Sequence, residues 1–126
     1  MFVHREPVRF RDLDPMGHVN NAVFLTYIED ARAAYFWHLG IARSLEDLTL
    51  VVARVEIDFR APVGFPEIVE VGVRAGRFGE KSFGLDHELR VRGELAAEAK
   101  TVLVAYDYAS AQTVEIPAAW REKLAA

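Results

Sequence analysis

Apolar residues between Asn21 and Leu39 recur at the spacing of an α-helix, as Phe24, Ile28, Ala31, Tyr35 and Leu39 show. We predict a helix that starts at Asn20 or Asn21, both good N-cap residues, and ends at Leu39 before Gly40. The apolar surface is wider than one stripe, because it also includes Leu25, Ala34 and Trp37, and we expect Tyr27, Tyr35 and Trp37 in the core. Such a helix should be covered on two sides, by its own sheet and by a second subunit.

The pattern changes to a period of two after Leu50, which is typical of a strand with one buried face. From Leu50 to Val63, one predicted face carries Val51, Ala53, Val55, Ile57, Phe59 and Ala61. Further strands are predicted at Phe2–Phe10, Glu67–Phe78, Lys81–Arg92 and Glu94–Tyr108, with hairpin turns at Gly79-Glu80 and at Gly93. Pro117 to Leu124 is predicted to form a short C-terminal helix.

The predicted elements follow the order β-α-β-β-β-β. One long helix followed by strands joined through hairpins favours an antiparallel sheet of about five strands, and hence the α+β class. The chain has 126 residues, which is enough for one core and not for two. We therefore treat residues 1–126 as a single domain.

Composition narrows the function classes. Apolar residues make up 52% of the chain and charged residues 27%, which is typical of a globular protein. The formal charge of −4 argues against a general nucleic-acid binder, and the lack of cysteine excludes disulfides, thiolate metal sites and cysteine nucleophiles. No basic and then apolar leader opens the chain and no apolar run could span a bilayer, so we expect a cytoplasmic protein that is not bound to a membrane.

The candidate chemistry lies just before the long helix. Asp14 stands in a polar turn with Gly17, and a carboxylate there can act as a general base toward water or attack an acyl carbon itself. The nearby helix N-terminus could donate N–H groups to the oxyanion that forms when a carbonyl is attacked. The alternative is that Asp14 only caps its turn, and spacing alone favours that interpretation.

The neighbouring polar residues allow more than one role. Asp12 is expected to pair with an arginine or to accept backbone hydrogen bonds. His18 is a candidate base or substrate ligand, and Asn20 and Asn21 are N-cap residues that could also orient water or a carbonyl. Glu29 and Arg32 are expected to form an i,i+3 pair. No ligand spacing indicates a metal site, and no nucleotide-binding or serine hydrolase motif occurs.

Two stretches resemble the hotdog-fold thioesterases of the 4-hydroxybenzoyl-CoA thioesterase family, which includes bacterial acyl-CoA thioesterases. RFRDLDPMGHVNNAVFLTYIEDAR is similar to the family signature Asp-x-Asp-x-x-Gly-His-Val-Asn-Asn that runs into the central helix, and VARVEIDFRAPVGFPEIVEVGVRAGRFGEKSF is similar to its strand–Pro–strand–Gly-x-Lys-Ser part. The similarity extends roughly from Val8 to Val104. It implies a hotdog fold, in which a curved antiparallel sheet wraps a long central helix, and a homodimer or homotetramer with active sites between subunits.

The resemblance also implies roles for individual residues. The family's catalytic aspartate maps onto Asp14, and its oxyanion donors are backbone N–H groups at the helix start, here from Asn20 to Ala22. Further residues matched to substrate binding are Gly17, Phe59, Lys81 and Ser82. Members that act on the aromatic 4-hydroxybenzoyl group have Ile-Val-Tyr-like residues in place of His18, Val19 and Asn20, so this chain is more similar to thioesterases for fatty-acyl chains.

We therefore predict hydrolysis of an acyl-CoA thioester, most readily a fatty-acyl one, to free acid and CoA, without metal or redox cofactor. Coenzyme A enters only as part of the substrate. One alternative is a non-catalytic acyl-CoA sensor on the same fold. A second alternative is a phosphatase in which Asp12 would be the nucleophile, although the downstream acidic pair that this chemistry usually needs is missing.

Overall fold

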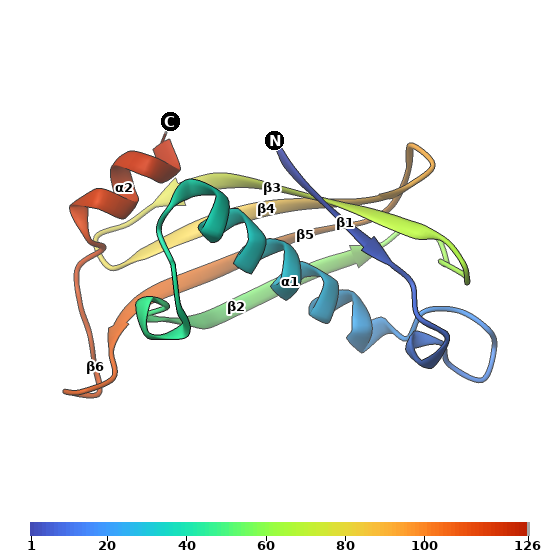
Figure 1. Cartoon of the computed structure of the whole chain (residues 1–126), viewed down its shortest axis with the longest axis horizontal. Coiled ribbons are helices and arrows are strands. Elements are labelled where there is room, and N and C mark those ends of the chain that lie inside the picture. Colours follow the sequence, from blue (N-terminus) through green and yellow to red (C-terminus); the bar gives the residue numbers. More distant parts are fainter. Residues whose placement is uncertain (126) are drawn as a thin grey trace.

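The computed structural model describes residues 1–125 and shows a single curved sheet with one long helix lying across its concave face (Figure 1). The strands are β1 (Phe2–Pro7), β2 (Leu50–Phe59), β3 (Ile68–Phe78), β4 (Ser82–Val91), β5 (Glu94–Asp107) and β6 (Gln112–Thr113). The helices are α1 (Asn21–Leu39) and α2 (Ala118–Ala125), and short 3₁₀ turns lie at Phe10–Asp12 and Leu45–Asp47. The α+β class, the hotdog fold and the predicted element order are thereby confirmed.

The central helix α1 begins and ends where its capping residues indicate. Asn20 is the N-cap, and its side-chain Oδ1 accepts a hydrogen bond from the N–H of Ala22 at 2.9 Å. Gly40 ends the helix in the left-handed conformation at φ 73° and donates its N–H to the carbonyls of Phe36 and Trp37. The boundaries predicted from the sequence are therefore confirmed.

One stripe of α1 packs against the sheet. Its buried residues are Phe24, Tyr27, Ile28, Ala31, Tyr35 and Phe36. The prediction that Trp37 belongs to this core is wrong for the single chain, because Trp37 is 56% exposed. Leu25, at 42%, is also exposed, so the sheet covers only one side of the wide apolar surface. The predicted pair between Arg32 and Glu29 is present, with an N–O distance of 3.7 Å.

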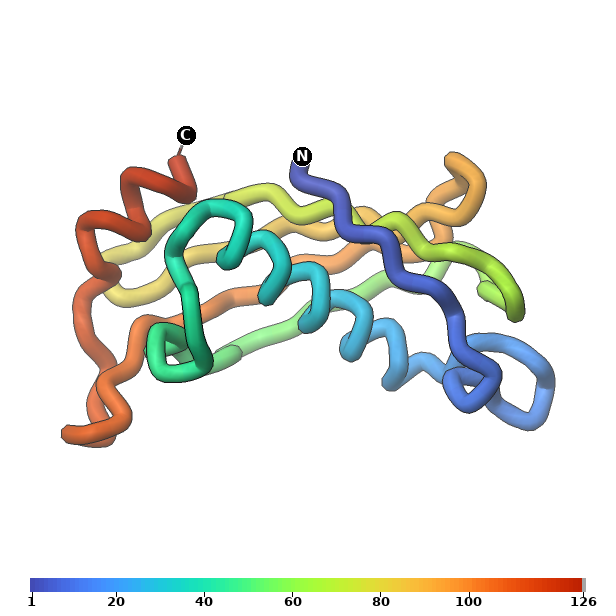
Figure 2. Tube along the Cα trace, in the orientation of Figure 1, coloured from blue at the N-terminus to red at the C-terminus, as the bar shows by residue number. Residues whose placement is uncertain are grey.

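All neighbouring strands of the sheet are antiparallel, in the spatial order β1-β3-β4-β5-β2, with β6 pairing to β5. Alternate residues of β4 point into the core, which accounts for the burial of Phe83, Leu85, His87 and Leu89. The same alternation on β3 buries Val69, Val71 and Val73. The tube in Figure 2 shows how the strands curve around α1, so that these side chains and the helix stripe meet in one core.

Strand β2 is an edge strand, and it departs from the predicted alternation. A β-bulge at Ala53 shifts the register with β5, so that Val52 lies opposite Leu103 and Val55 opposite Thr101. Val51 therefore lies on the other face from Val55, and the predicted uniform face is wrong there. The strand also ends at Phe59 and not at Val63. Its core-facing side chains remain uncovered, since Val52 is 44%, Val55 39% and Phe59 44% exposed.

Two smaller differences lie near the ends of strands. The first strand stops at Pro7 and not at Phe10, and a 3₁₀ turn follows at Phe10–Asp12. The short β6 was not predicted, since two residues carry no detectable period. Within residues 1–125, no helix combines the length and the hydrophobicity needed to cross a membrane.

Candidate active site

The loop between Leu13 and Asn20 holds Asp14 in a tight turn. An isolated bridge joins Leu13 to Val19, and the N–H of Asp14 donates to the carbonyl of His18 at 2.7 Å. Gly17 occupies the left-handed region at φ 82°, which lets the chain reverse within these few residues. The side-chain Oδ1 of Asp14 accepts hydrogen bonds from the N–H groups of Met16, at 2.9 Å, and His18, at 3.2 Å. The carboxylate thus caps its own turn, as the simpler interpretation expects.

The same carboxylate also lines a cleft. This cleft has a volume of about 430 Å³ and lies at the start of α1. Its lining residues are Asp14, Met16, His18, Val19, Asn20, Asn21, Phe24, Phe59, Arg60, Ala61 and Pro62. Asp14 is half-buried there and is not turned to bulk solvent. Turn capping and a position in a cleft are therefore compatible, because one carboxylate oxygen makes the turn contacts.

The wall opposite the polar loop is apolar. The rings of Phe24 on α1 and Phe59 at the end of β2 meet edge to face, with centroids 5.2 Å apart. The hydrogen bond from the N–H of Val19 to the carbonyl of Val63, at 2.8 Å, ties the segment after β2 to the loop. An apolar wall facing a polar rim suits a ligand with an acyl chain and a polar reacting group.

The N–H groups at the start of α1 are not equally available. The N–H of Asn20 donates to the carbonyl of Asp12 at 2.9 Å, and that of Ala22 donates to the Asn20 side chain. The N–H of Val23 donates to the carbonyl of Asn20. Among residues 1–125 the N–H of Asn21 makes no comparable hydrogen bond, and Asn21 lines the cleft. Asn21 therefore supplies the free donor at the positive end of the helix.

Asp12 lies outside the cleft. Its side chain is only 5% exposed and accepts the N–H of Arg9 at 2.9 Å, and the Arg9 guanidinium lies 3.3 Å from its Oδ1. The predicted pairing with an arginine and with a backbone donor is confirmed. A carboxylate enclosed in this way cannot reach a substrate, so the phosphatase alternative, with Asp12 as nucleophile, is wrong.

The predicted site residues fall into three groups. Those that line the cleft are Asp14, His18, Asn20, Asn21 and Phe59. Gly17 and Ala22 shape the loop and the helix start without lining the cleft. Lys81 and Ser82 lie where the turn after β3 leads into β4. Figure 1 shows this turn at the opposite end of the sheet from the loop before α1. The neighbouring Glu80 carbonyl accepts the N–H of Ile116.

Six lining residues are not among the predicted site residues: Met16, Val19 and Phe24 within the loop and helix, and Arg60, Ala61 and Pro62 after β2. The three residues after β2 fall within the predicted strand from Leu50 to Val63, where the sequence does not distinguish them from other strand residues. Their adjacency to Phe59 was the one available signal. Arg60 pairs with Glu98 at 2.7 Å, which keeps its guanidinium beside the sheet. Within residues 1–125, no three His, Asp or Glu side chains form a group that could hold a metal ion.

Comparison with known proteins places this chain in a family. Residues 8–124 match the Thioesterase-like superfamily. The chain belongs to this superfamily. The match includes the whole loop with Asp14, all of α1 and strands β2 to β6, so the resemblance inferred from the two sequence stretches is confirmed.

Individual proteins are similar to this chain over different lengths. The long-chain acyl-CoA thioesterase FadM of Escherichia coli (strain K12) is 27% identical over 126 residues, covering 93% of this chain and 92% of FadM. A thioesterase from Thermus thermophilus, solved in complex with coenzyme A and Zn, is 43% identical with a TM-score of 0.89, covering 97% of this chain and 90% of that one. The protein YsmA of Bacillus subtilis (strain 168) is 29% identical over 86 residues, and the match spans 68% of this chain but only 58% of YsmA.

Proposed function

We propose that this protein hydrolyses an acyl-CoA thioester to the free acid and CoA, with Asp14 as the catalytic carboxylate. The observation that carries the proposal is the half-buried Asp14 in a cleft that the start of α1 also lines. Membership of the Thioesterase-like superfamily supports the reaction class. The names of FadM and of the CoA-bound Thermus protein support CoA as the carrier of the acyl group.

The proposed reaction begins with the thioester carbonyl placed at the start of α1. Asp14 either removes a proton from water that attacks the carbonyl carbon or attacks that carbon itself to form an anhydride, which water then cleaves. In both routes the negative charge that develops on the carbonyl oxygen is stabilised by the free N–H of Asn21 and the helix dipole, an effect of about 3 kcal/mol for one well-placed donor. In the first route the C–S bond then breaks and Asp14 passes the water proton to the CoA thiolate. In the second route the C–S bond breaks as the anhydride forms, and the water that cleaves the anhydride supplies the proton for the thiolate.

A fatty-acyl group fits the apolar side of the cleft. The edge-to-face rings of Phe24 and Phe59 provide a hydrophobic wall beside the proposed reacting centre. His18 and Asn20 stand at the polar rim, where they can bind the thioester or orient water. In this scheme no metal or redox cofactor takes part, because the carboxylate and the helix donor supply the charge stabilisation.

We also propose that the working form is a homodimer, alone or as the unit of a homotetramer. Strand β2 is an edge strand, and its core-facing Val52, Val55 and Phe59 are uncovered in the single chain. Pairing with β2 of a second copy would cover them and satisfy the free edge of the sheet. Lys81 and Ser82 do not line the cleft of their own chain, so in this proposal they contact CoA that is bound in the cleft of the second copy.

The test is the substitution Asp14→Asn, which keeps the size of the side chain and the hydrogen bonds of its turn. We expect thiol release from palmitoyl-CoA to fall by a factor of about 10³ or more, with binding of CoA unchanged. Asp107→Asn is a matched control, because Asp107 accepts the N–H of Ala109 at 3.0 Å in its own turn and so caps in the same way. Near-normal turnover by Asp14→Asn would remove Asp14 from its role. Saturable binding of acyl-CoA without thiol release by the unmodified protein would instead favour the sensor.

A further inference from the structure

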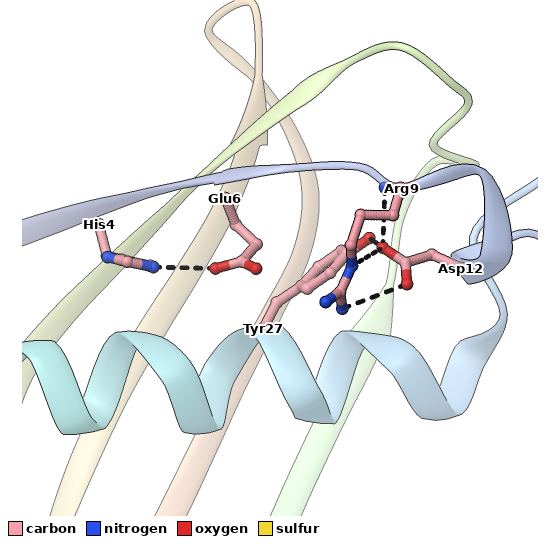
Figure 3. Close-up of polar contacts among 5 residues, drawn as sticks. All are labelled: His4, Glu6, Arg9, Asp12 and Tyr27. Atoms are coloured by element: carbon pink, nitrogen blue, oxygen red, sulfur yellow. Dashed lines mark hydrogen bonds and ion pairs between the residues drawn. The ribbon is translucent and has the colours of Figure 1, made fainter.

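A buried polar cluster lies behind the loop that carries Asp14. Figure 3 shows the side chains of Arg9 and Tyr27 converging on Asp12, Arg9 from the segment after β1 and Tyr27 from α1. The Tyr27 hydroxyl donates to Oδ2 of Asp12 at 2.6 Å, and Tyr27 itself has no exposed surface. The Arg9 backbone N–H reaches the same oxygen, and its guanidinium lies 3.3 Å from Oδ1. Donors from two separate elements therefore hold one carboxylate.

The pKa values of Asp12 and Tyr27 suit a hydrogen bond from the hydroxyl to the carboxylate. Burial tends to raise the pKa of Asp12, but the hydrogen bonds from Tyr27 and Arg9 outweigh it, and the pKa of Asp12 is lowered from its ordinary value. Burial and the hydrogen bond to Asp12 raise the pKa of the Tyr27 hydroxyl, which therefore remains a donor at neutral pH. A short hydrogen bond between a hydroxyl and a carboxylate of this kind is strong and directional.

The Asp12 cluster joins the two ends of the loop that carries Asp14. The backbone carbonyl of Asp12 accepts the N–H of Asn20, the N-cap of α1, at 2.9 Å. One step further in, Leu13 bridges to Val19. Asp12 therefore closes the loop that carries Asp14, and its bond to Tyr27 fixes this loop to the second turn of α1. The first turn of the same helix carries the free N–H of Asn21. The distance between the Asp14 carboxylate and the N–H of Asn21 depends on this attachment.

We infer that Tyr27 and Asp12 are positioning residues that hold the Asp14 loop against the start of α1 in the geometry required for thioester hydrolysis. The inference rests on the proposed role of Asp14. Neither side chain touches the cleft, so neither is expected to contact substrate. A loss of alignment of about 1 Å at a reacting centre is enough to reduce a rate by about 100-fold.

The experiment compares Tyr27→Phe with Tyr35→Phe in thiol release from palmitoyl-CoA. Both substitutions remove only a hydroxyl from a buried tyrosine of α1, but Tyr35 lies two turns further along and does not contact Asp12. We expect Tyr27→Phe to lower kcat by about 10- to 100-fold with KM unchanged, and Tyr35→Phe to retain the wild-type kcat. Wild-type kcat in a folded Tyr27→Phe protein would overturn the inference.

A double-mutant cycle separates positioning from a general loss of structure. If Tyr27 acts through Asp14, then adding Tyr27→Phe to Asp14→Asn leaves the small residual rate unchanged. A further fall by the same factor as in the wild-type background would show an independent structural effect and would overturn the inference. Full activity of Asp14→Asn alone would refute the proposed function instead, so the two failures are distinguishable.

A second variant keeps the test informative if Tyr27→Phe does not fold. Arg9→Gln removes the guanidinium from the other side of Asp12, and the Arg9 side chain is 45% exposed, so its loss leaves the core intact. We expect a smaller fall in kcat, again with KM unchanged and again absent in the Asp14→Asn background. An unchanged kcat would contradict the positioning role of the cluster.

Discussion

The buried imidazole of His87 makes the stability of this protein depend on pH. His87 lies on β4 beneath α1 and is 2% exposed. Its Nε2 is 3.0 Å from the Thr101 hydroxyl, while its Nδ1 has no hydrogen-bond partner within residues 1–125. Burial, together with the positive charge of Arg32 on α1, lowers the pKa of His87 from 6.5 to about 4, against a smaller opposing effect of Asp86.

The sign of the effect follows from which state binds the proton. Above pH 6.5 the imidazole is neutral in both the folded and the unfolded chain, so it causes no pH dependence. Between pH 6.5 and about 4 the unfolded chain binds a proton that the folded chain excludes, so the free energy of unfolding falls as the pH falls. At pH 4.5 this one group is expected to have removed about 2.5 kcal/mol, a large share of the stability of a small domain.

The assay is urea unfolding followed by tryptophan fluorescence at several pH values between 7.5 and 4.5, with protein concentration held constant. His87→Leu is expected to lose some stability at pH 7.5, because Thr101 is left without its partner, and to show a dependence on pH that is flatter by about 2.5 kcal/mol over this range. Thr101→Val is the control, since it removes the hydrogen bond but keeps the titrating imidazole, and it should retain the wild-type slope. Equal slopes in wild type and His87→Leu would refute the reasoning.

Two further substitutions test the edge strand and the helix end. Val55→Lys places a charge on the uncovered side of β2, where a single chain can expose it to solvent. We expect a folded monomer in analytical ultracentrifugation, with little thiol release. A dimer with normal activity would contradict the proposed interface. Gly40→Ala places a Cβ on a residue in the left-handed conformation at φ 73°, and we expect the free energy of unfolding in urea to fall by about 1 kcal/mol. Gly64→Ala is the control, because Gly64 has open space around it and no left-handed φ, and its stability should be nearly unchanged. Equal effects would show that the backbone conformation is not the cause.

Elements whose signals are local were predicted well from the sequence. The ends of α1 depend on Asn20 and Gly40, whose capping preferences act over one turn, and the structure places both caps as expected. The strands β3, β4 and β5 were found within about one residue at most ends, because alternation and glycine turns are also local. Trp37 and β2 were less well predicted, since burial and register depend on what packs against them.

In the candidate site, too, local features were predicted from the sequence and contacts between distant segments were not. Asp14 could be singled out, but turn capping and a catalytic position could not be separated by spacing, and only the fold shows that one carboxylate does the first while facing the cleft. The contact of Tyr27 with Asp12 joins residues 15 positions apart, and no short-range pattern predicts it. Arg60, Ala61 and Pro62 reach the cleft because a backbone hydrogen bond ties the segment after β2 to the loop.

By itself, the sequence determined the α+β class, the order of the elements, the start and end of the long helix and the loop that carries the candidate chemistry. These depend on backbone preferences and side-chain periods that neighbours along the chain set. Only the tertiary structure decided which N–H at the helix start is free, which acid is enclosed and which one faces the cleft. Those outcomes depend on contacts between segments distant in sequence, and such contacts exist only once the sheet has curved around the helix.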